Sequence, residues 1–142
     1  MLDTHFYVDV LRGAPTADAV VRLIGSRTAV VDFHAVVGAE LLLGAPDARA
    51  AERVRQRIVD RFKPGRVLAP DAEDLFAAGD AMRQLRAAAG PHPEHARRNV
   101  WNDVVIAVTC RRRGRVLVSR DADHARIAGV VGHRVLPAPP GA

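Results

Sequence analysis

The sequence has 142 residues, which is enough for one domain with a hydrophobic core of its own. Its 49% hydrophobic and 26% charged residues are ordinary for a globular protein, and a single cysteine, Cys110, excludes an internal disulfide and any multi-cysteine zinc site. The formal net charge is +5 and every basic residue except Lys63 is an arginine, which suits a polyanionic partner but is also what a GC-rich coding sequence produces.

The N-terminal segment and the hydropathy indicate the compartment. The first residues carry Asp3 and Asp9 and have no basic head followed by an apolar stretch, so they do not form a secretory signal. No apolar run approaches the ~20 residues that cross a bilayer. We therefore expect a cytoplasmic protein, with Cys110 as a small core residue inside an apolar run.

Strand-like and helix-like segments alternate from the beginning of the chain. Residues 2–4 can only be the end of a strand, and residues 18–24 predict a short helix. The β-branched run at 28–31 predicts a second strand. A helix over residues 34–43 follows, and Gly44 is its stop signal.

The middle of the chain predicts three further helices. Residues 47–62 are amphipathic, with apolar side chains on one face and arginines on the other. A short strand at 66–69 and a long helix at 71–89 come next. Residues 104–110, VVIAVTC, could form a buried strand or a helix. The three arginines after them, followed by Gly114, favour the helix, because helices end on cations and then a glycine.

The last segments complete an alternating pattern. Residues 115–119 predict a strand, 121–128 a short helix, 133–136 a last strand and 137–142 a flexible proline-rich tail. Strands separated by helices pair in parallel through right-handed crossovers. We therefore expect a single α/β domain over residues 1–136, with a central parallel sheet and helices on both faces. In such sheets, ligands bind beyond the carboxyl ends of the strands.

Four acids stand at the edges of otherwise apolar segments. Asp3 closes the first strand, and Asp121 follows the strand at 115–119, although an aspartate there is also a common helix N-cap. Glu40 is the only charge between Ala35 and Ala45, in a helix so apolar that we expect it to be buried; the alternative is a narrow exposed stripe. Asp103 opens a helix with five apolar residues after it, where it could also serve the helix dipole.

Together these four acids predict a metal site. Grouped carboxylates repel one another, and a hard divalent cation with oxygen ligands removes that cost. Mg²⁺, or Mn²⁺, is the natural guest, because it keeps positions open for water and phosphate oxygens. Such a site supports hydrolysis of a phosphodiester. The sequence thus favours a metal-dependent nuclease with Asp3, Glu40, Asp103 and Asp121 as catalytic residues and metal ligands.

Four segments occur in an order and at spacings that resemble one family. They are LDTHFYVDVLRG at 2–13, GAELLLGA at 38–45, NDVVIAVTCRRRG at 102–114 and LVSRDADHARI at 117–127. They resemble the PIN-domain nucleases, in particular the VapC-type toxins of bacterial toxin–antitoxin pairs, and the resemblance runs from residue 1 to about 136.

The resemblance implies a PIN-like α/β/α fold, Mg²⁺-dependent endoribonuclease activity, a homodimer and a small antitoxin that blocks the site. By this resemblance Asp3, Glu40 and Asp103 match the first three acids of the family. Asp121 matches the fourth, and Asp123 is a substitute or accessory ligand. Ser119 stands where the family often has a Thr or Ser that supports the acids.

The chain departs from the family at its beginning. His5 stands where Asn or Ser is usual, which puts the surroundings of Asp3 in doubt. Only two residues precede Asp3, so either the first strand is short or the true start lies upstream. His5 also excludes haloacid-dehalogenase phosphatases, which need a second aspartate at that position.

Several alternatives stay open from the sequence. Arg97 and Arg98 could bind RNA phosphates or be solvated, and the arginines at 111–113 could do so or only cap a helix. His92 and His95 could bind a metal, but their Gly-Pro loop favours a solvated role. The rival functions are a non-catalytic PIN-like module that binds a protein, and a metal-dependent nuclease that acts on DNA.

Overall fold

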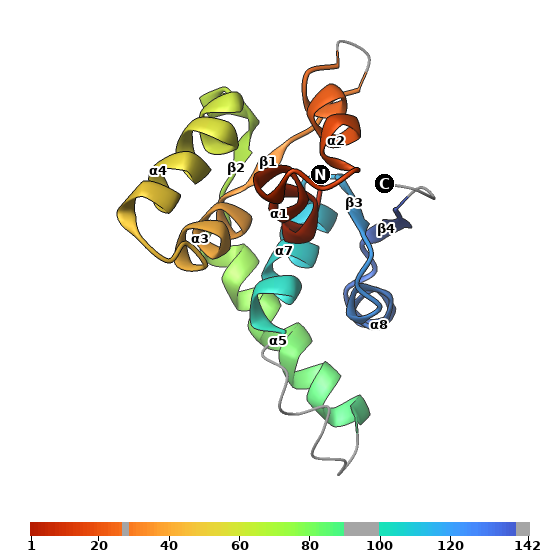
Figure 1. The fold of residues 1–142 in the computed structure, drawn as a ribbon. Coiled ribbons are helices and arrows are strands. Elements are labelled where there is room, and N and C mark those ends of the chain that lie inside the picture. The colour runs from red at the N-terminus through yellow and green to blue at the C-terminus, as the bar shows by residue number, and fades with distance from the viewer. Residues whose placement is uncertain (27–28, 90–99, 139–142) are drawn as a thin grey trace. The chain divides into compact units, whose positions relative to one another are not determined.

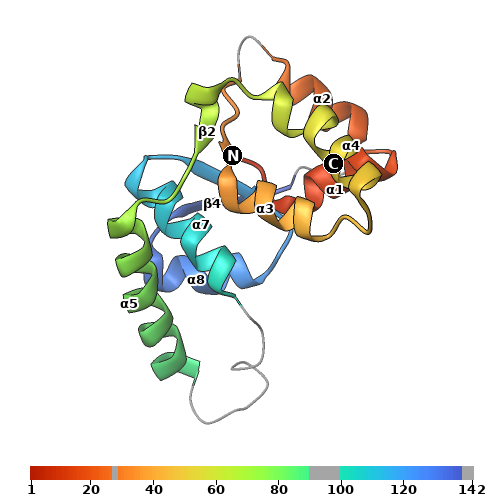
Figure 2. The same cartoon turned by 90° about the vertical axis from the view of Figure 1, so that its left-hand side faces the viewer.

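A computed structural model of the chain describes residues 1–26, 29–89 and 100–138. Its contacts divide the chain into two units, Met1–Ala69 with Pro137–Ala142 (unit 1) and Pro70–Leu136 (unit 2). Figures 1 and 2 show that helices predominate and that the strands are short. The strands form two two-stranded sheets, β1 with β2 and β3 with β4. Over the described ranges, no helix has the length and apolar character needed to cross a membrane.

Unit 1 is built on a parallel pair of strands. Phe33 lies opposite Val67 and His34 opposite Leu68. The elements in chain order are α1 (Thr4–Arg12), α2 (Ala17–Ile24), β1 (Phe33–His34), α3 (Ala35–Leu43), α4 (Ala48–Arg57), the 3₁₀ turns η1 (Val59–Arg61) and η2 (Pro64–Arg66), and β2 (Val67–Leu68). Helix α1 contacts α2, α3 and α4, so it lies at the centre of this unit.

An aromatic cluster forms the core of unit 1. The rings of Phe33 and Phe62 stack with centroids 4.8 Å apart, and Tyr7 meets the Phe33 ring edge-on at 5.2 Å. A Cβ atom on Gly38 would approach Phe33 Cε1 to 3.0 Å, so only a glycine lets α3 pack this closely on the ring. The buried ring of Phe33 therefore fixes the position of α3, which carries Glu40 two residues after Gly38.

Unit 2 is organised around one buried helix. Its elements are α5 (Ala72–Ala89), α7 (Trp101–Arg112), β3 (Val116–Ser119), α8 (Asp123–Val131) and β4 (Arg134–Pro137). Every residue of α7 from Val104 to Cys110 is buried, because α5, α8 and β3 all pack against this helix. The cations of its last turn and a left-handed Gly114 (φ +62°) end the helix as the sequence predicts.

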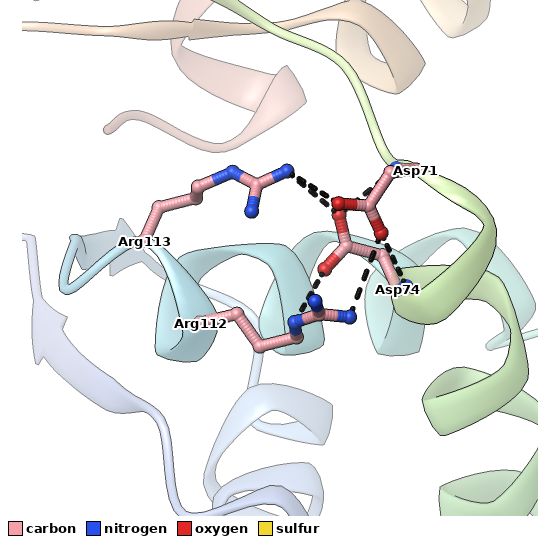
Figure 3. Close-up of polar contacts among 4 residues, drawn as sticks. All are labelled: Asp71, Asp74, Arg112 and Arg113. Atoms are coloured by element: carbon pink, nitrogen blue, oxygen red, sulfur yellow. Dashed lines mark hydrogen bonds and ion pairs between the residues drawn. The ribbon is translucent and has the colours of Figure 1, made fainter.

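A polar network joins the two long helices of unit 2. Asp71 and Asp74 accept hydrogen bonds from each other's backbone N–H, at 2.8 and 3.0 Å, and so cap the start of α5. Arg112 and Arg113, at the end of α7, pair with both carboxylates (Figure 3). The Asp74 N–H, and then the Arg113 guanidinium, lower the pKa of Asp71 below its ordinary value. These two arginines therefore link the end of α7 to the start of α5.

The α/β class and most of the predicted helices are confirmed, although over the described residues the strands form two two-stranded sheets rather than one central sheet, and two further details are corrected. Residues 2–4 do not end a strand: Leu2 makes an isolated bridge and α1 begins at Thr4. The strand predicted at 28–31 is not observed over its described residues 29–31, and β1 comes later, at Phe33–His34. The ambiguous run at 104–110 is helical, as the glycine and arginine signals predict.

Candidate active site

Asp3 is held by the first turn of α1. It is the N-cap of this helix, with extended backbone (φ −76°, ψ 163°), and its Oδ1 accepts a hydrogen bond of 2.7 Å from the Thr4 N–H. Its Oδ2 lies 3.3 Å from His5 Nδ1. Asp3 is only 7% exposed. Cap geometry and the neighbouring ring thus fix the carboxylate at the start of a helix, where the dipole stabilises its charge.

Glu40 is linked to the same turn through Thr4. The Thr4 Oγ1 hydroxyl donates a hydrogen bond of 2.5 Å to Glu40 Oε2. Glu40 is half-buried rather than fully buried, which corrects the expectation from the sequence. Helix α3 buries only the face with Val37, Gly38 and Leu41, so Glu40 lies on its flank. One threonine therefore connects two acids that are 37 residues apart in the chain.

Tyr7 is a buried neighbour of Asp3 on α1. Tyr7, one turn further along α1, is fully buried between the aromatic rings of the core. Its phenolic oxygen has no hydrogen-bond partner among the described residues. Burial, and then the charge of Asp3, raise the pKa of Tyr7 far above its ordinary value, so the phenol stays neutral. The charge of Asp3 therefore lies close enough to the buried phenol to act on it.

Asp103 and a buried histidine form the corresponding pair in unit 2. Asp103 lies in the first turn of α7, with its side chain 28% exposed, and its Oδ1 is 3.8 Å from Nε2 of the fully buried His124. The ring of His133 meets the His124 ring edge-on, with centroids 5.9 Å apart. Burial, and then the neighbouring His124, lower the pKa of His133 to about 4, so this ring is neutral near pH 7.

Asp121 and Asp123 lie in the turn between β3 and α8. The hydroxyl of the buried Ser119 accepts a hydrogen bond of 2.9 Å from the Asp121 N–H. Asp121 is exposed, and its Oδ1 accepts a hydrogen bond of 2.8 Å from the Asp123 N–H. Asp123 is half-buried and lies 3.6 Å from Arg126 Nη2. The N-cap of α8 is Ala122, without a side-chain cap, so Asp121 is not the helix N-cap considered from the sequence; its carboxylate closes a local turn to Asp123, and Ser119 shapes that turn.

The donors in each unit suit a hard cation. Unit 1 contributes the carboxylates of Asp3 and Glu40, and unit 2 those of Asp103, Asp121 and Asp123. Mg²⁺ usually takes one or two carboxylates from a protein and keeps water on its other positions. The Thr4-linked pair Asp3 and Glu40 fits that requirement by its donor chemistry. No group of three or more His, Cys, Asp or Glu side chains in the described ranges is arranged to hold a metal ion. The four-acid site stays a prediction.

Some candidate residues lie outside the described part of the chain, and some contacts of the acids were not predicted. Arg97 and Arg98 lie outside the described residues, as do His92 and His95. The contacts of Thr4, His5 and His124 with the acids were not predicted from the sequence. For Thr4 and His5, the Asp-Thr start of an amphipathic helix was an available signal. For His124 there was none, because Asp103 lies 21 residues away in the chain.

Comparisons with known proteins identify the family and the fold. The profile of the PIN domain matches residues 1–130. No curated protein sequence gives a significant match. Among solved structures, the chain resembles VapBC2 from Rickettsia felis bound to a DNA fragment from their promoter (TM-score 0.69, 16% identity, 98% of both chains). It also resembles DNA-bound VapBC from Salmonella typhimurium (0.68, 21%, 96% of both) and FitAcB from Neisseria gonorrhoeae (0.63, 25%, 95% of this chain and 94% of that one).

Proposed function

Since the chain belongs to the PIN domain family, we propose that it is a Mg²⁺-dependent endoribonuclease and the toxin of a toxin–antitoxin pair. The family match supports a nuclease. The observation that carries the proposal is the pair of hydrogen bonds from Thr4, which hold Asp3 and Glu40 at one turn of α1. The N-cap role accounts for Asp3 but not for a glutamate beside it. A cation that binds both carboxylates would account for the arrangement, because it would offset their mutual repulsion.

In this proposal Asp3, Glu40, Asp103 and Asp121 hold the metal. Mg²⁺, or Mn²⁺, supplies Lewis acidity toward the phosphodiester. Thr4 orients Asp3 and Glu40, and Ser119 orients Asp121. We favour Asp121 over Asp123 as the fourth acid, because the carboxylate of Asp123 already faces the guanidinium of Arg126. Asp123 is then an accessory ligand.

Cleavage assays with purified protein test the nuclease. Total cellular RNA and single-stranded DNA are incubated with the chain in Mg²⁺ or in EDTA, and the ends of the fragments are mapped. We expect RNA to be cut only in Mg²⁺, and Asp103→Asn to abolish cutting. The matched control is Asp60→Asn, because Asp60 is an exposed acid of η1 outside the proposed site. Full activity in excess EDTA would exclude the metal, and cutting of DNA alone would change the substrate.

The toxin role rests on the likeness to VapBC and FitAcB, whose names denote paired proteins. We propose that a small antitoxin, encoded beside this chain, binds and inhibits it, and that the toxin itself is a homodimer. Growth is measured after induction of the wild type, of Asp103→Asn, and of the wild type with its neighbour. Arrest by the wild type alone is the expected result. Equal growth in all three cultures would replace the toxin by a non-catalytic binding module.

A further inference from the structure

One face of α4 carries a row of arginines. Arg49, Arg53 and Arg57 follow one another at intervals of four residues, which places them along one line of the helix. All three are exposed. At a rise of about 1.5 Å per residue, the row is about 12 Å long with a cation every ~6 Å. These three residues are called the α4 arginine row.

The α4 arginine row has no counter-charge of its own. In the part of the chain that the structure describes, none of the three arginines has a carboxylate partner. The acid nearest to them on the helix, Glu52, instead accepts a hydrogen bond of 2.7 Å from Gln56. The acid before the helix, Asp47, caps the Ala50 N–H at 2.7 Å. Like charges four residues apart destabilise a helix, and the helix dipole offsets this only for Arg57, in the last turn.

Some other arginines of the described residues are paired with acids, whereas exposed ones such as Arg22, Arg86 and Arg134 are not. Arg66 lies 2.9 Å from the buried Asp32, and Arg112 and Arg113 pair with Asp71 and Asp74. The fold therefore supplies carboxylates where arginines serve the structure. What distinguishes the α4 arginine row from the other exposed arginines is its even spacing along one helix, which suits a partner with repeated negative charge.

We propose that the α4 arginine row binds the phosphate backbone of single-stranded RNA. This inference rests on the proposed ribonuclease function and names a contact of its substrate. Guanidinium groups pair with phosphates bidentately, and evenly spaced cations suit a chain of phosphates. Helix α4 buries Ala50 and Val54, so packing holds the helix and its arginine row in place. It also packs against α3, the helix of Glu40 (Figure 1).

The composition of the exposed face favours nucleic acid over an acidic protein. A protein helix that docks on another helix needs apolar anchors as well as charges. Helix α4 has no exposed large hydrophobic residue. It also has no aromatic residue that could stack on a base. The row therefore fits the sugar–phosphate backbone and contributes affinity and orientation without reading the sequence.

A salt titration of binding tests the row. The test variant replaces Arg49, Arg53 and Arg57 by Gln, which keeps good helix propensity. The control variant replaces Arg22, Arg86 and Arg134 by Gln, three exposed arginines on other elements, and so changes the net charge equally. Binding of a fluorescent oligouridine of about 20 nucleotides is followed by anisotropy in EDTA. The comparison ligands are an oligodeoxyuridine of the same length and polyglutamate.

Binding weakens as salt rises, and each phosphate contact on a single strand contributes ~0.7 to the steepness of log K against log salt. Losing three contacts should therefore make this dependence shallower by about 2. The test variant should then bind the RNA about 100-fold more weakly at ~0.1 M salt and converge with the wild type near ~1 M. The control variant should keep the wild-type slope. A third variant with Lys at the three positions keeps the charge and should retain most of the slope.

The outcomes separate the inference from the proposed function. Equal slopes for the test and control variants would refute RNA binding by the α4 arginine row. Weaker binding of polyglutamate alone would refute it too. A similar loss on the RNA and DNA strands supports the backbone contact. Because binding is measured in EDTA, it does not depend on cleavage. A chain that binds RNA through the row but cuts nothing in Mg²⁺ refutes the nuclease and leaves the row standing. Melting temperatures equal to or above the wild type exclude misfolding of the variants.

Discussion

Thr4 contacts two of the candidate acids. Its backbone N–H donates to Asp3, and its hydroxyl donates to Glu40. The first bond survives any substitution except proline, because it uses the main chain. The second depends on the hydroxyl alone. Thr4 is therefore the residue at which the orientation of Glu40 can be changed without changing an acid.

Thr4→Val keeps the shape of the side chain and removes the hydroxyl. We expect the Mg²⁺ concentration for half-maximal RNA cleavage to rise about 10- to 100-fold, as is usual when the partner of a metal-binding carboxylate is lost. Thr4→Ser restores the donor and should return the value close to that of the wild type. Both variants are assayed for cleavage across a Mg²⁺ titration. A Val variant that needs no more Mg²⁺ than the Ser variant would remove Thr4 from the site.

His133 couples stability to pH. Its pKa is about 4 in the folded protein, because of burial and of His124, and about 6.5 in an unfolded chain. Between these values the unfolded chain binds the proton and the folded chain does not, so acid favours unfolding. The stabilisation is complete above pH ~6.5 and is lost as the pH falls toward 4.

His133→Leu should flatten this dependence. The measurement is the urea midpoint of the wild type and the variant at several pH values from about 7.5 to about 4.5. The wild type should lose stability more steeply than the variant over that range, because the variant has no proton to take up at this position. Parallel curves for the two proteins would contradict this, because they would mean that His133 takes up its proton at the same pH in the folded and the unfolded protein.

At the scale of whole elements, the start of α5 and the end of α7 are held by the four residues of Figure 3. Asp74 is fully buried, whereas Arg112 and Arg113 are each about one-third exposed. An acid inside such a network receives the cap N–H and two guanidinium groups at once. The contribution is therefore larger than that of a surface ion pair, which is about 0–1 kcal/mol.

Asp74→Ala should lower the free energy of unfolding by about 2–3 kcal/mol, because a helix cap and the partner of two cations are lost together. The control is Asp80→Ala on the same helix, where Asp80 and Arg83 are both about three-quarters exposed and 3.9 Å apart. It should change stability by about 0.5 kcal/mol or less. Urea denaturation of both variants makes the comparison. Similar losses for both would show that helix propensity at α5, rather than the network, sets the stability.

The elements that the sequence predicts well are those with local signals. The buried run of α7 is helical because its end carries arginines and a glycine, and these act within one turn. Helix α1 was missed, although Asp3 as N-cap and Gly13 with φ +67° are signals of the same kind. An interpretation of Leu2–Thr4 as a strand concealed them. Strand β1 came later than predicted because β-branched residues favour a strand without fixing where pairing begins.

The acids show the same division between local and distant information. Their identity follows from charges placed in apolar segments, but their surroundings do not. Thr4 reaches Glu40 across 36 positions, and His124 approaches Asp103 across 21, so no window of the sequence contains either pair. The half-exposed position of Glu40 likewise depends on the packing of Gly38 on Phe33. Whether the acids act together is a property of the whole molecule, and it can be tested at that scale.

Thermal unfolding of the whole chain makes this test. A ligand that binds only the folded state stabilises it by about 2.7 kcal/mol at a concentration 100 times its Kd, which for a chain of this length raises Tm by about 10 °C. We expect that shift with Mg²⁺ and not with KCl at equal ionic strength. If the four acids bind the same metal, Asp3→Asn and Asp103→Asn should each abolish the shift, although they lie in different units.

If the acids lie together, the same variants should melt no lower than the wild type in EDTA, because each would remove one of several charges that repel one another. Asp60→Asn should keep the full Mg²⁺ shift, since Asp60 is an exposed acid of η1. A shift lost in only one of the two site variants would mean that the acids of the two units serve different purposes. A shift retained in both would place the Mg²⁺ elsewhere and withdraw the metal-dependent mechanism from these residues.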